Sequence, residues 1–103
     1  MKFEDFKKVF LNKQFDGDCF VFDYIDNNYR LIENIEKKKE IEEILPILYR
    51  TQYIYLDYID GVKNKKLDSI LFNYNIEDFY IDLKTELFNI LEITDEELEK
   101  IYY

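Results

Sequence analysis

The stretch CFVFDYIDNNYRLIENI, residues 19–35, decides the fold, because its pattern fits either a helix or a β-hairpin. As a helix it has Asp18 as its N-cap and places four apolar side chains on one face: Phe22, Ile25, Tyr29 and Ile32. As a hairpin it has two strands around the turn-forming residues DNN at 26–28. The helix is favoured, because the whole chain has only three Val, three Thr and two Gly, residue types on which hairpin-rich domains depend.

The spacing of apolar residues predicts helices on both sides of this stretch. Over residues 3–13, Phe3, Phe6 and Phe10 form a single stripe. After residue 33 a second helix is expected, with four apolar residues on a shared face: Ile41, Ile44, Leu45 and Leu48. Pro46 has no backbone N–H to donate, so this helix is expected to kink there or to stop and restart.

Charge spacing supports the same helix, because Glu33 precedes Lys37 by four residues, a spacing that predicts an ion pair on one face. The pair DG at 60–61 is typical of a helix C-terminus, where Gly takes the left-handed conformation. A lysine-rich loop follows, and then a short helical pattern: Lys63, Lys65 and Lys66, followed by Leu67, Ile70, Leu71 and Tyr74.

Two more helices are predicted towards the C-terminus. Asn75 suits the N-cap of a helix that runs to about Glu92, and the sequence TDEE at 94–97 is a capping box for a last helix. The chain is therefore expected to be one acidic globular domain over residues 1–103, mostly α, in a compact bundle of five or six short helices. The alternative is an α+β fold with a hairpin around residues 19–35.

The composition argues against an enzyme. The chain has no His, one Cys and one Ser, so it lacks the usual general base, zinc ligands and nucleophile arrangements. Gly17 and Gly61 are too far apart to form a glycine-rich phosphate loop, and the sequence DGD at 16–18 is better read as a turn and helix entry than as a cation site. We therefore expect no catalytic residues, no metal and no cofactor.

The start of the chain is charged and is followed by no long apolar run, which predicts a cytoplasmic protein without a membrane-spanning segment. Cys19, the one cysteine, is expected to be a small core residue, because no neighbouring cation favours its thiolate.

Negative charge is concentrated towards the C-terminus. The net charge of the chain is −9, and residues 51–103 hold twelve acidic and five basic residues, a net charge of −7. Helix dipoles and the capping box explain part of this excess. On a helix from residue 76, however, Asp78, Asp82 and Glu86 form a ridge of like charge, which is unfavourable unless a positive group faces it.

These features predict a surface that binds a basic partner, made of acidic residues and of tyrosines that offer rigid contacts. Its candidate residues are Asp78, Asp82, Glu86, Glu92, Glu96, Glu99, Tyr80, Tyr102 and Tyr103. The same charge would also keep an apolar domain dispersed in water.

The function expected from this surface is that of a non-enzymatic inhibitor, which occupies the basic site of a nuclease or another nucleic-acid-handling protein and does not itself bind nucleic acid. Immunity-type and anti-defence-type inhibitors, which mimic nucleic acid by charge, fit this description. The alternative is a structural or regulatory helical subunit, which forms a homo-oligomer or joins a larger assembly through an apolar face widened by Ile81 and Phe88.

Overall fold

The ambiguous stretch at residues 19–35 is helical. The computed structural model describes residues 1–63 and 75–103, with five α-helices and one 3₁₀ turn in those ranges. In chain order they are α1 (Phe3–Leu11), α2 (Asp18–Asn28), η1 (Tyr29–Leu31), α3 (Ile35–Lys63), α4 (Ile76–Ile90) and α5 (Asp95–Ile101). The mostly α prediction is confirmed, and the hairpin alternative is wrong. The predicted lysine loop beyond Lys63 and the helix from Leu67 to Tyr74 lie outside the described residues.

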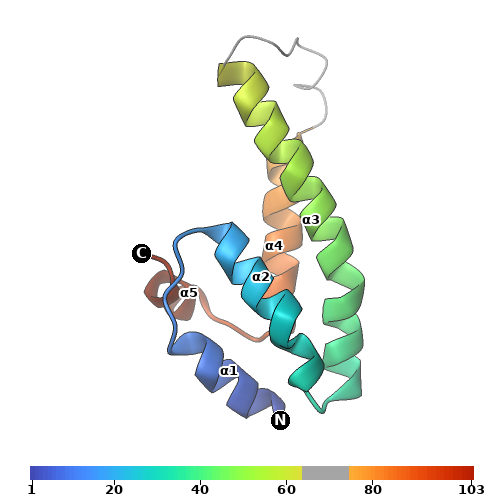
Figure 1. Ribbon diagram of the computed structural model, residues 1–103, viewed down its shortest axis with the longest axis vertical. Helices are drawn as coiled ribbons and strands as arrows, with labels where there is room; N and C mark the ends of the chain where they lie inside the picture. The colour runs from blue at the N-terminus through green and yellow to red at the C-terminus, as the bar shows by residue number, and fades with distance from the viewer. Residues whose placement is uncertain (64–74) are drawn as a thin grey trace.

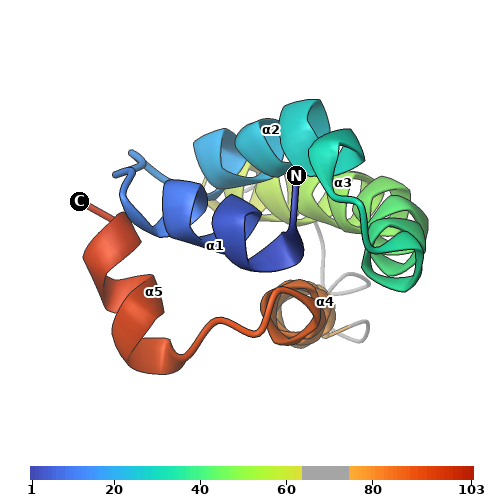
Figure 2. The same cartoon turned by 90° about the horizontal axis from the view of Figure 1, so that it is seen from below.

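Helices α3 and α4 are the axis of the molecule. They run antiparallel and side by side, and α1, α2 and α5 gather around their lower half (Figure 1). Seen from below, α1 and α2 lie on one side of the core, α4 and α5 lie on the other, and α3 closes one flank (Figure 2). One face of α3 and one face of α4 therefore remain outside the bundle.

The core is built from the faces that the apolar spacing predicted. Phe6 and Phe10 of α1 are buried, as are all four residues of the predicted stripe at 22–32 and all four at 41–48. Four aromatic rings pack together where α1, α2 and the loop between them meet, with centroid separations of 5.5–6.4 Å: Phe6, Phe10, Phe15 and Tyr24. Burial of large side chains on every helix explains how a chain of this length stabilises one fold.

The entry to α2 depends on Gly17. Its φ of +104° is a conformation that other L-residues rarely adopt, and it occupies the N-cap position. The predicted turn and helix entry at DGD is confirmed, but the cap lies one residue earlier than expected. Asp18 is the first residue of α2 and makes no cap hydrogen bond, so its carboxylate is free to bind groups elsewhere.

Cys19 is exposed, and its predicted place in the core is wrong. It lies in the first turn of α2, where its Sγ accepts a hydrogen bond of 3.4 Å from Gln52 of α3. The stripe that enters the core begins two residues later, at Val21 and Phe22, so the helical register turns Cys19 outward.

The predicted ion pair between Glu33 and Lys37 does not form. Glu33 precedes α3 and lies 3.1 Å from the N-terminal amino group of Met1. Lys37 instead reaches α4, where its Nζ donates to the carbonyl of Ile90 at 2.8 Å and lies 3.8 Å from Glu92. Tertiary contacts therefore replace the local pair.

Helix α3 is longer than the short helices expected, because it continues through Pro46 and past the predicted stop at 60–61 to Lys63. Pro46 cannot donate to the carbonyl of Glu42, one turn earlier, and its ring crowds that turn. Packing of the same turn into the core, through Ile44, Leu45 and Leu48, compensates for this local cost.

Replacing Pro46 by Ala restores the missing N–H donor at an exposed position. We expect Pro46→Ala to raise the free energy of unfolding by about 1–3 kcal/mol, measured by urea unfolding and circular dichroism. Glu42→Ala is the control, because it changes an exposed side chain of the same turn without adding a backbone donor, and it should stay within about 0.5 kcal/mol of the parent. Equal stabilities for Pro46→Ala and the parent would contradict this account.

Candidate functional site

A cluster of polar side chains around Asp18 joins α2, α4 and the C-terminal segment. Oδ2 of Asp18 accepts hydrogen bonds from the Tyr80 hydroxyl at 2.6 Å and from Lys84 Nζ at 3.1 Å. Oδ1 accepts one from the Tyr102 hydroxyl at 2.7 Å. The Asp18 side chain is only 22 % exposed, so these charge-assisted bonds form largely out of contact with water.

The same contacts set the protonation states. Burial alone raises the pKa of Asp18, but the hydrogen bonds from Tyr80, Tyr102 and Lys84, together with the Lys84 charge, outweigh burial and lower that pKa below its usual value. Burial, and then the Asp18 carboxylate, raise the pKa of Tyr80 and of Tyr102 well above its usual value. At neutral pH the cluster is thus one carboxylate with two neutral phenols, which suits a structural contact better than proton transfer.

Tyr80 is an internal residue. It is 5 % exposed, its ring stacks on that of Tyr55 at a centroid distance of 5.0 Å, and its hydroxyl accepts a bond of 3.4 Å from buried Gln52. Its predicted role as a surface contact therefore does not fit its position. Tyr102 is half-buried against Asp18, whereas Tyr103 is 83 % exposed.

The predicted acidic residues fall into separate groups. Asp78, Asp82 and Glu86 are exposed along one edge of α4, as the ridge requires. Glu96 and Glu99 are exposed on α5, which lies across the core from α3 (Figure 2). The structure therefore does not bring the predicted residues together on one surface.

Glu92 follows α4 and has a structural explanation that the sequence did not reveal. It has a φ of +56°, and it takes the position where Gly usually ends a helix. The N–H of Ile93 donates to the Phe88 carbonyl and that of Glu92 to the Asn89 carbonyl, which is the bond pattern of a Schellman cap. Lys37 pairs with the Glu92 carboxylate and Lys7 donates to its carbonyl.

The caps of the last two helices differ. The box at 94–97 is confirmed, with Thr94 Oγ1 and Glu97 bonded reciprocally at 3.2 and 2.9 Å. Asn75 stands at the predicted N-cap of α4, but its backbone is left-handed and its side chain makes no cap bond.

A groove of about 400 Å³ lies between α3 and α4, on the face outside the bundle. Its lining is partly apolar and partly acidic. We call the apolar residues the floor and the glutamates the rim: Ile44, Ile47, Leu83 and Ile90 make up the floor, and Glu40, Glu43 and Glu86 make up the rim. These positions follow helical spacing on both helices, which keeps them on one face of each. Glu86 thus connects the predicted α4 ridge with two glutamates of α3.

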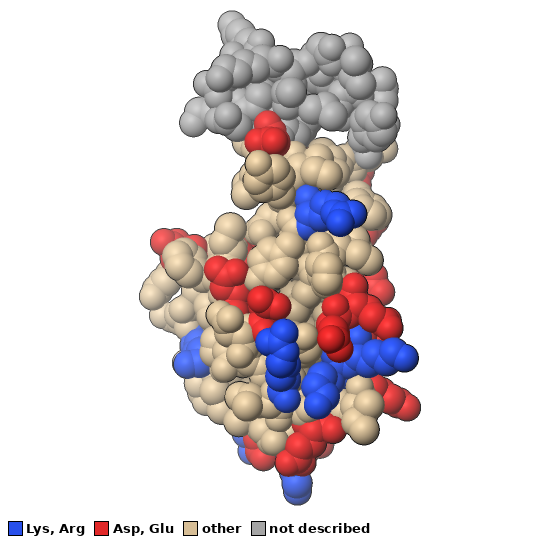
Figure 3. Space-filling view, turned by 45° about the vertical axis from the view of Figure 1, so that its right-hand side comes forward, with Lys and Arg blue, Asp and Glu red and all other residues tan. Residues whose placement is uncertain are grey.

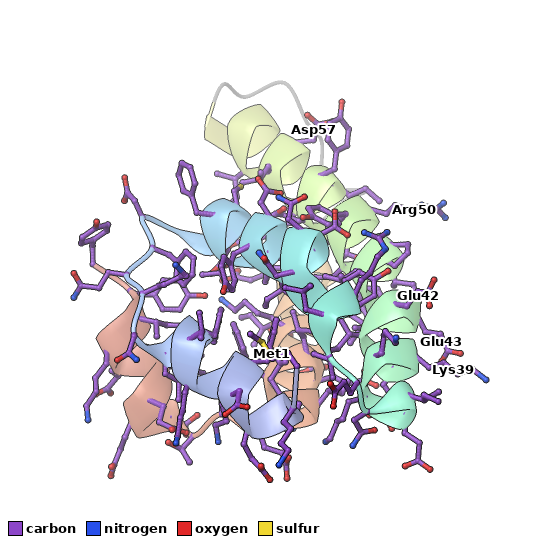
Figure 4. The ribbon with its side chains drawn as sticks, turned by 60° about the horizontal axis from the view of Figure 1, so that its bottom comes forward. Met1, Lys39, Glu42, Glu43, Arg50 and Asp57 are labelled. Atoms are coloured by element: carbon purple, nitrogen blue, oxygen red, sulfur yellow. The ribbon has the colours of Figure 1, made fainter. Side chains whose placement is uncertain are left out.

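The rim carboxylates make no ion pair with the described residues. Within residues 1–63 and 75–103, none of Glu40, Glu43 and Glu86 has an ion-pair or hydrogen-bond partner. Figure 3 shows acidic side chains gathered over the lower half of the described surface, with several Lys and Arg among them. In Figure 4, Glu43 projects from α3 away from the bundle. The groove therefore combines apolar surface with free negative charge, the composition of a site for a basic, partly apolar ligand.

Sequence reasoning missed Glu40 and Glu43, because their significance depends on α3 lying antiparallel to α4. Their spacing from Ile44 and Ile47 places the four on one helical face, which was the available signal.

A second hollow and the acidic clusters of the described residues offer no better site. A smaller hollow of about 150 Å³ has Lys84 and Tyr102 among its lining residues, and both are already bound to Asp18. In the ranges that the structure describes, no three Asp, Glu or Cys side chains are grouped closely enough to hold a metal ion. The groove is therefore the best candidate for binding.

Comparisons of this chain with protein-family models, with curated proteins and with solved structures found no match. Among the described residues, no helix has the length and apolar character needed to cross a membrane.

Replacing Asp18 by Asn removes the charge that accepts three hydrogen bonds. We expect Asp18→Asn to lower the free energy of unfolding at pH 7 by about 1–3 kcal/mol. Because the pKa of Asp18 is lowered by folding, its contribution is present above about pH 4 and is lost as the pH falls through the folded-state pKa. The difference between parent and variant should therefore shrink as urea unfolding is repeated from pH 6 down to pH 2.5. A difference that stays constant over this range would show that the Asp18 charge is not the cause.

Replacing Glu92 by Gly keeps the left-handed backbone but relieves its strain, because Gly has no Cβ. Since a residue with a Cβ costs about 1–2 kcal/mol in this conformation and the exposed pair with Lys37 contributes less, Glu92→Gly should stabilise the protein by about 0.5–1 kcal/mol. Glu92→Ala is the control, because it loses the ion pair and keeps the strain, so it should not stabilise. Thermal unfolding measures both, and a destabilised Glu92→Gly would contradict the strain.

Proposed function

We propose that this chain is a non-enzymatic protein-binding module, which receives a basic segment of a partner protein in the groove between α3 and α4. The observation that carries the proposal is the set of three unpaired glutamates around an apolar floor. Repulsion between these like charges destabilises the free protein slightly, and this repulsion is relieved when cations bind between them.

The floor and the rim of the groove would contribute differently to binding. Burial of floor residues such as Ile47, which is 50 % exposed, would supply affinity at about 25 cal/mol per Å² of apolar surface covered. The glutamates would steer and orient the partner more than they strengthen the complex.

The finer proposal concerns the partner. A net charge of −9 favours approach to a protein whose surface is basic, and a common reason for such a surface is to hold nucleic acid. We propose an inhibitor of the immunity or anti-defence type, which competes with nucleic acid for the basic site of a nuclease or a related protein. The inhibitor itself would bind no nucleic acid, because its charge has the same sign as phosphate.

A second candidate is a helical subunit that assembles through an apolar surface. Of the two residues expected to widen that surface, Phe88 is in the core, but Ile81 is 44 % exposed. If this surface holds an assembly, light scattering should detect a multimer that survives high salt, whereas an acidic inhibitor should be monomeric alone.

The groove can be tested with a synthetic, fluorescently labelled 15-residue amphipathic helix of Leu and Lys. Fluorescence anisotropy should detect binding that weakens between 50 and 300 mM NaCl, since charge contributes to it. Glu43→Lys combined with Glu86→Lys should raise the Kd about tenfold, because two attractive contacts become repulsive.

The matched control is Glu96→Lys combined with Glu99→Lys, which changes the net charge equally on α5, outside the groove. We expect this control to change the Kd by about twofold or less. Equal weakening by the two double variants would show that only net charge matters, and the proposed groove would be wrong.

A further inference from the structure

We infer that the occupant of the groove is an amphipathic helix of about four turns, with basic residues over Glu40, Glu43 and Glu86 and an acidic residue over Arg50. This inference rests on the proposed function and names the kind of segment that the groove accepts.

The apolar floor extends beyond the groove in one direction. Ile54 follows Ile47 by two helical turns on the same face of α3, and it is 41 % exposed. Phe79 precedes Leu83 by one turn on α4 and is 50 % exposed. The two residues lie at the same end of the groove, because their chain neighbours Tyr55 and Tyr80 stack on one another at 5.0 Å.

The length of the surface from the Glu40 rim to the end of the floor at Ile54 sets the length of the occupant. From Glu40 to Ile54, α3 advances fourteen residues, which at about 1.5 Å per residue is about 21 Å. An α-helix that covers this distance has about fourteen residues, or four turns. Such a helix would present apolar residues at intervals of three and four to Ile44, Ile47 and Ile54 along one line.

A helix fits this surface better than an extended segment. The groove has α-helices on both sides, and in the described part of the chain no strand edge is present to pair with an extended backbone. A helix satisfies its own backbone groups and needs only side-chain contacts, which α3 and α4 offer as ridges and grooves.

Arg50 gives the surface a charge pattern. It lies seven residues after Glu43, two turns along α3, and Figure 4 shows both side chains projecting from the same side of that helix. Arg50 is exposed, and within residues 1–63 and 75–103 it has no ion-pair partner. A purely basic helix would therefore meet a repulsive contact at Arg50, which a helix with an acidic residue about two turns from a basic one would avoid.

Two synthetic helices test this pattern. Both are 15-residue Leu/Lys peptides, and the second has one Lys changed to Glu, on the edge of the apolar stripe and seven residues from another Lys. We expect Arg50→Glu to shift the ratio of the two Kd values about fivefold towards the all-Lys peptide. Lys8→Glu on α1 is the control of equal charge change, and it should leave the ratio unchanged.

The expected length of the bound helix is tested separately, by a substitution at the far end of the floor. Ile54→Ala should raise the Kd of the Leu/Lys peptide about fivefold, because it removes apolar contact area. Tyr53→Ala is the control, since Tyr53 is 71 % exposed and its helical position places it on another face of α3. We expect this control to bind as the parent does.

The outcomes separate the two proposals. If the Arg50 and Ile54 variants bind both peptides as the parent does while Glu43→Lys with Glu86→Lys weakens binding, the long helix is overturned and the proposed function stands. If that double variant also has no effect, both fail. Sedimentation that shows a dimer, dissociated by Ile54→Asp, would overturn the inference by showing that a second copy of this chain is the occupant.

Discussion

The Asp18 carboxylate is the contact on which the arrangement of the helices depends. Its bonds reach Tyr80 and Lys84 on α4 and Tyr102 after α5, residues that are 62 to 84 positions away in the chain. Gly17 makes this possible, because its backbone turn releases Asp18 from the N-cap of α2. The apolar core alone would hold these helices together, but a partly buried charge with three donors favours one alignment.

This alignment also explains why the groove exists. Tyr80 binds Asp18 on one side and contacts Gln52 and Tyr55 of α3 on the other. The core face of α4 is therefore fixed against α3. The adjacent faces of the two helices are left outside the bundle with their glutamates. A surface built on two long helices is rigid, which reduces the ordering cost when a partner binds.

Local signals in the sequence predicted most of the described helices, but not the length of α3 and not the site. Apolar spacing predicted the faces at Phe22 to Ile32 and at Ile41 to Leu48, and the box at 94–97 was recognised from four residues. The roles of Asp18 and Lys37 could not be predicted in the same way. Local spacing makes Asp18 an N-cap and Lys37 a partner of Glu33, but in the structure both side chains bind residues that are distant in the sequence. The acidic ridge on α4 was predicted, but its partners on α3, Glu40 and Glu43, needed knowledge of how the two helices pair.

The short parallel bridge between Phe15 and Tyr102 has a consequence for the end of the chain. Phe15 donates to Ile101 at 2.6 Å and accepts from the N–H of Tyr103 at 3.2 Å, next to the Tyr102 side chain that binds Asp18. A truncation after Tyr102 would cost the protein a single backbone bond between these segments. A truncation after Ile101 would keep the bond from Phe15 to the Ile101 carbonyl but would also leave the Asp18 carboxylate with one donor fewer, so the side chain of Tyr102 matters more to this junction than the residue that follows it.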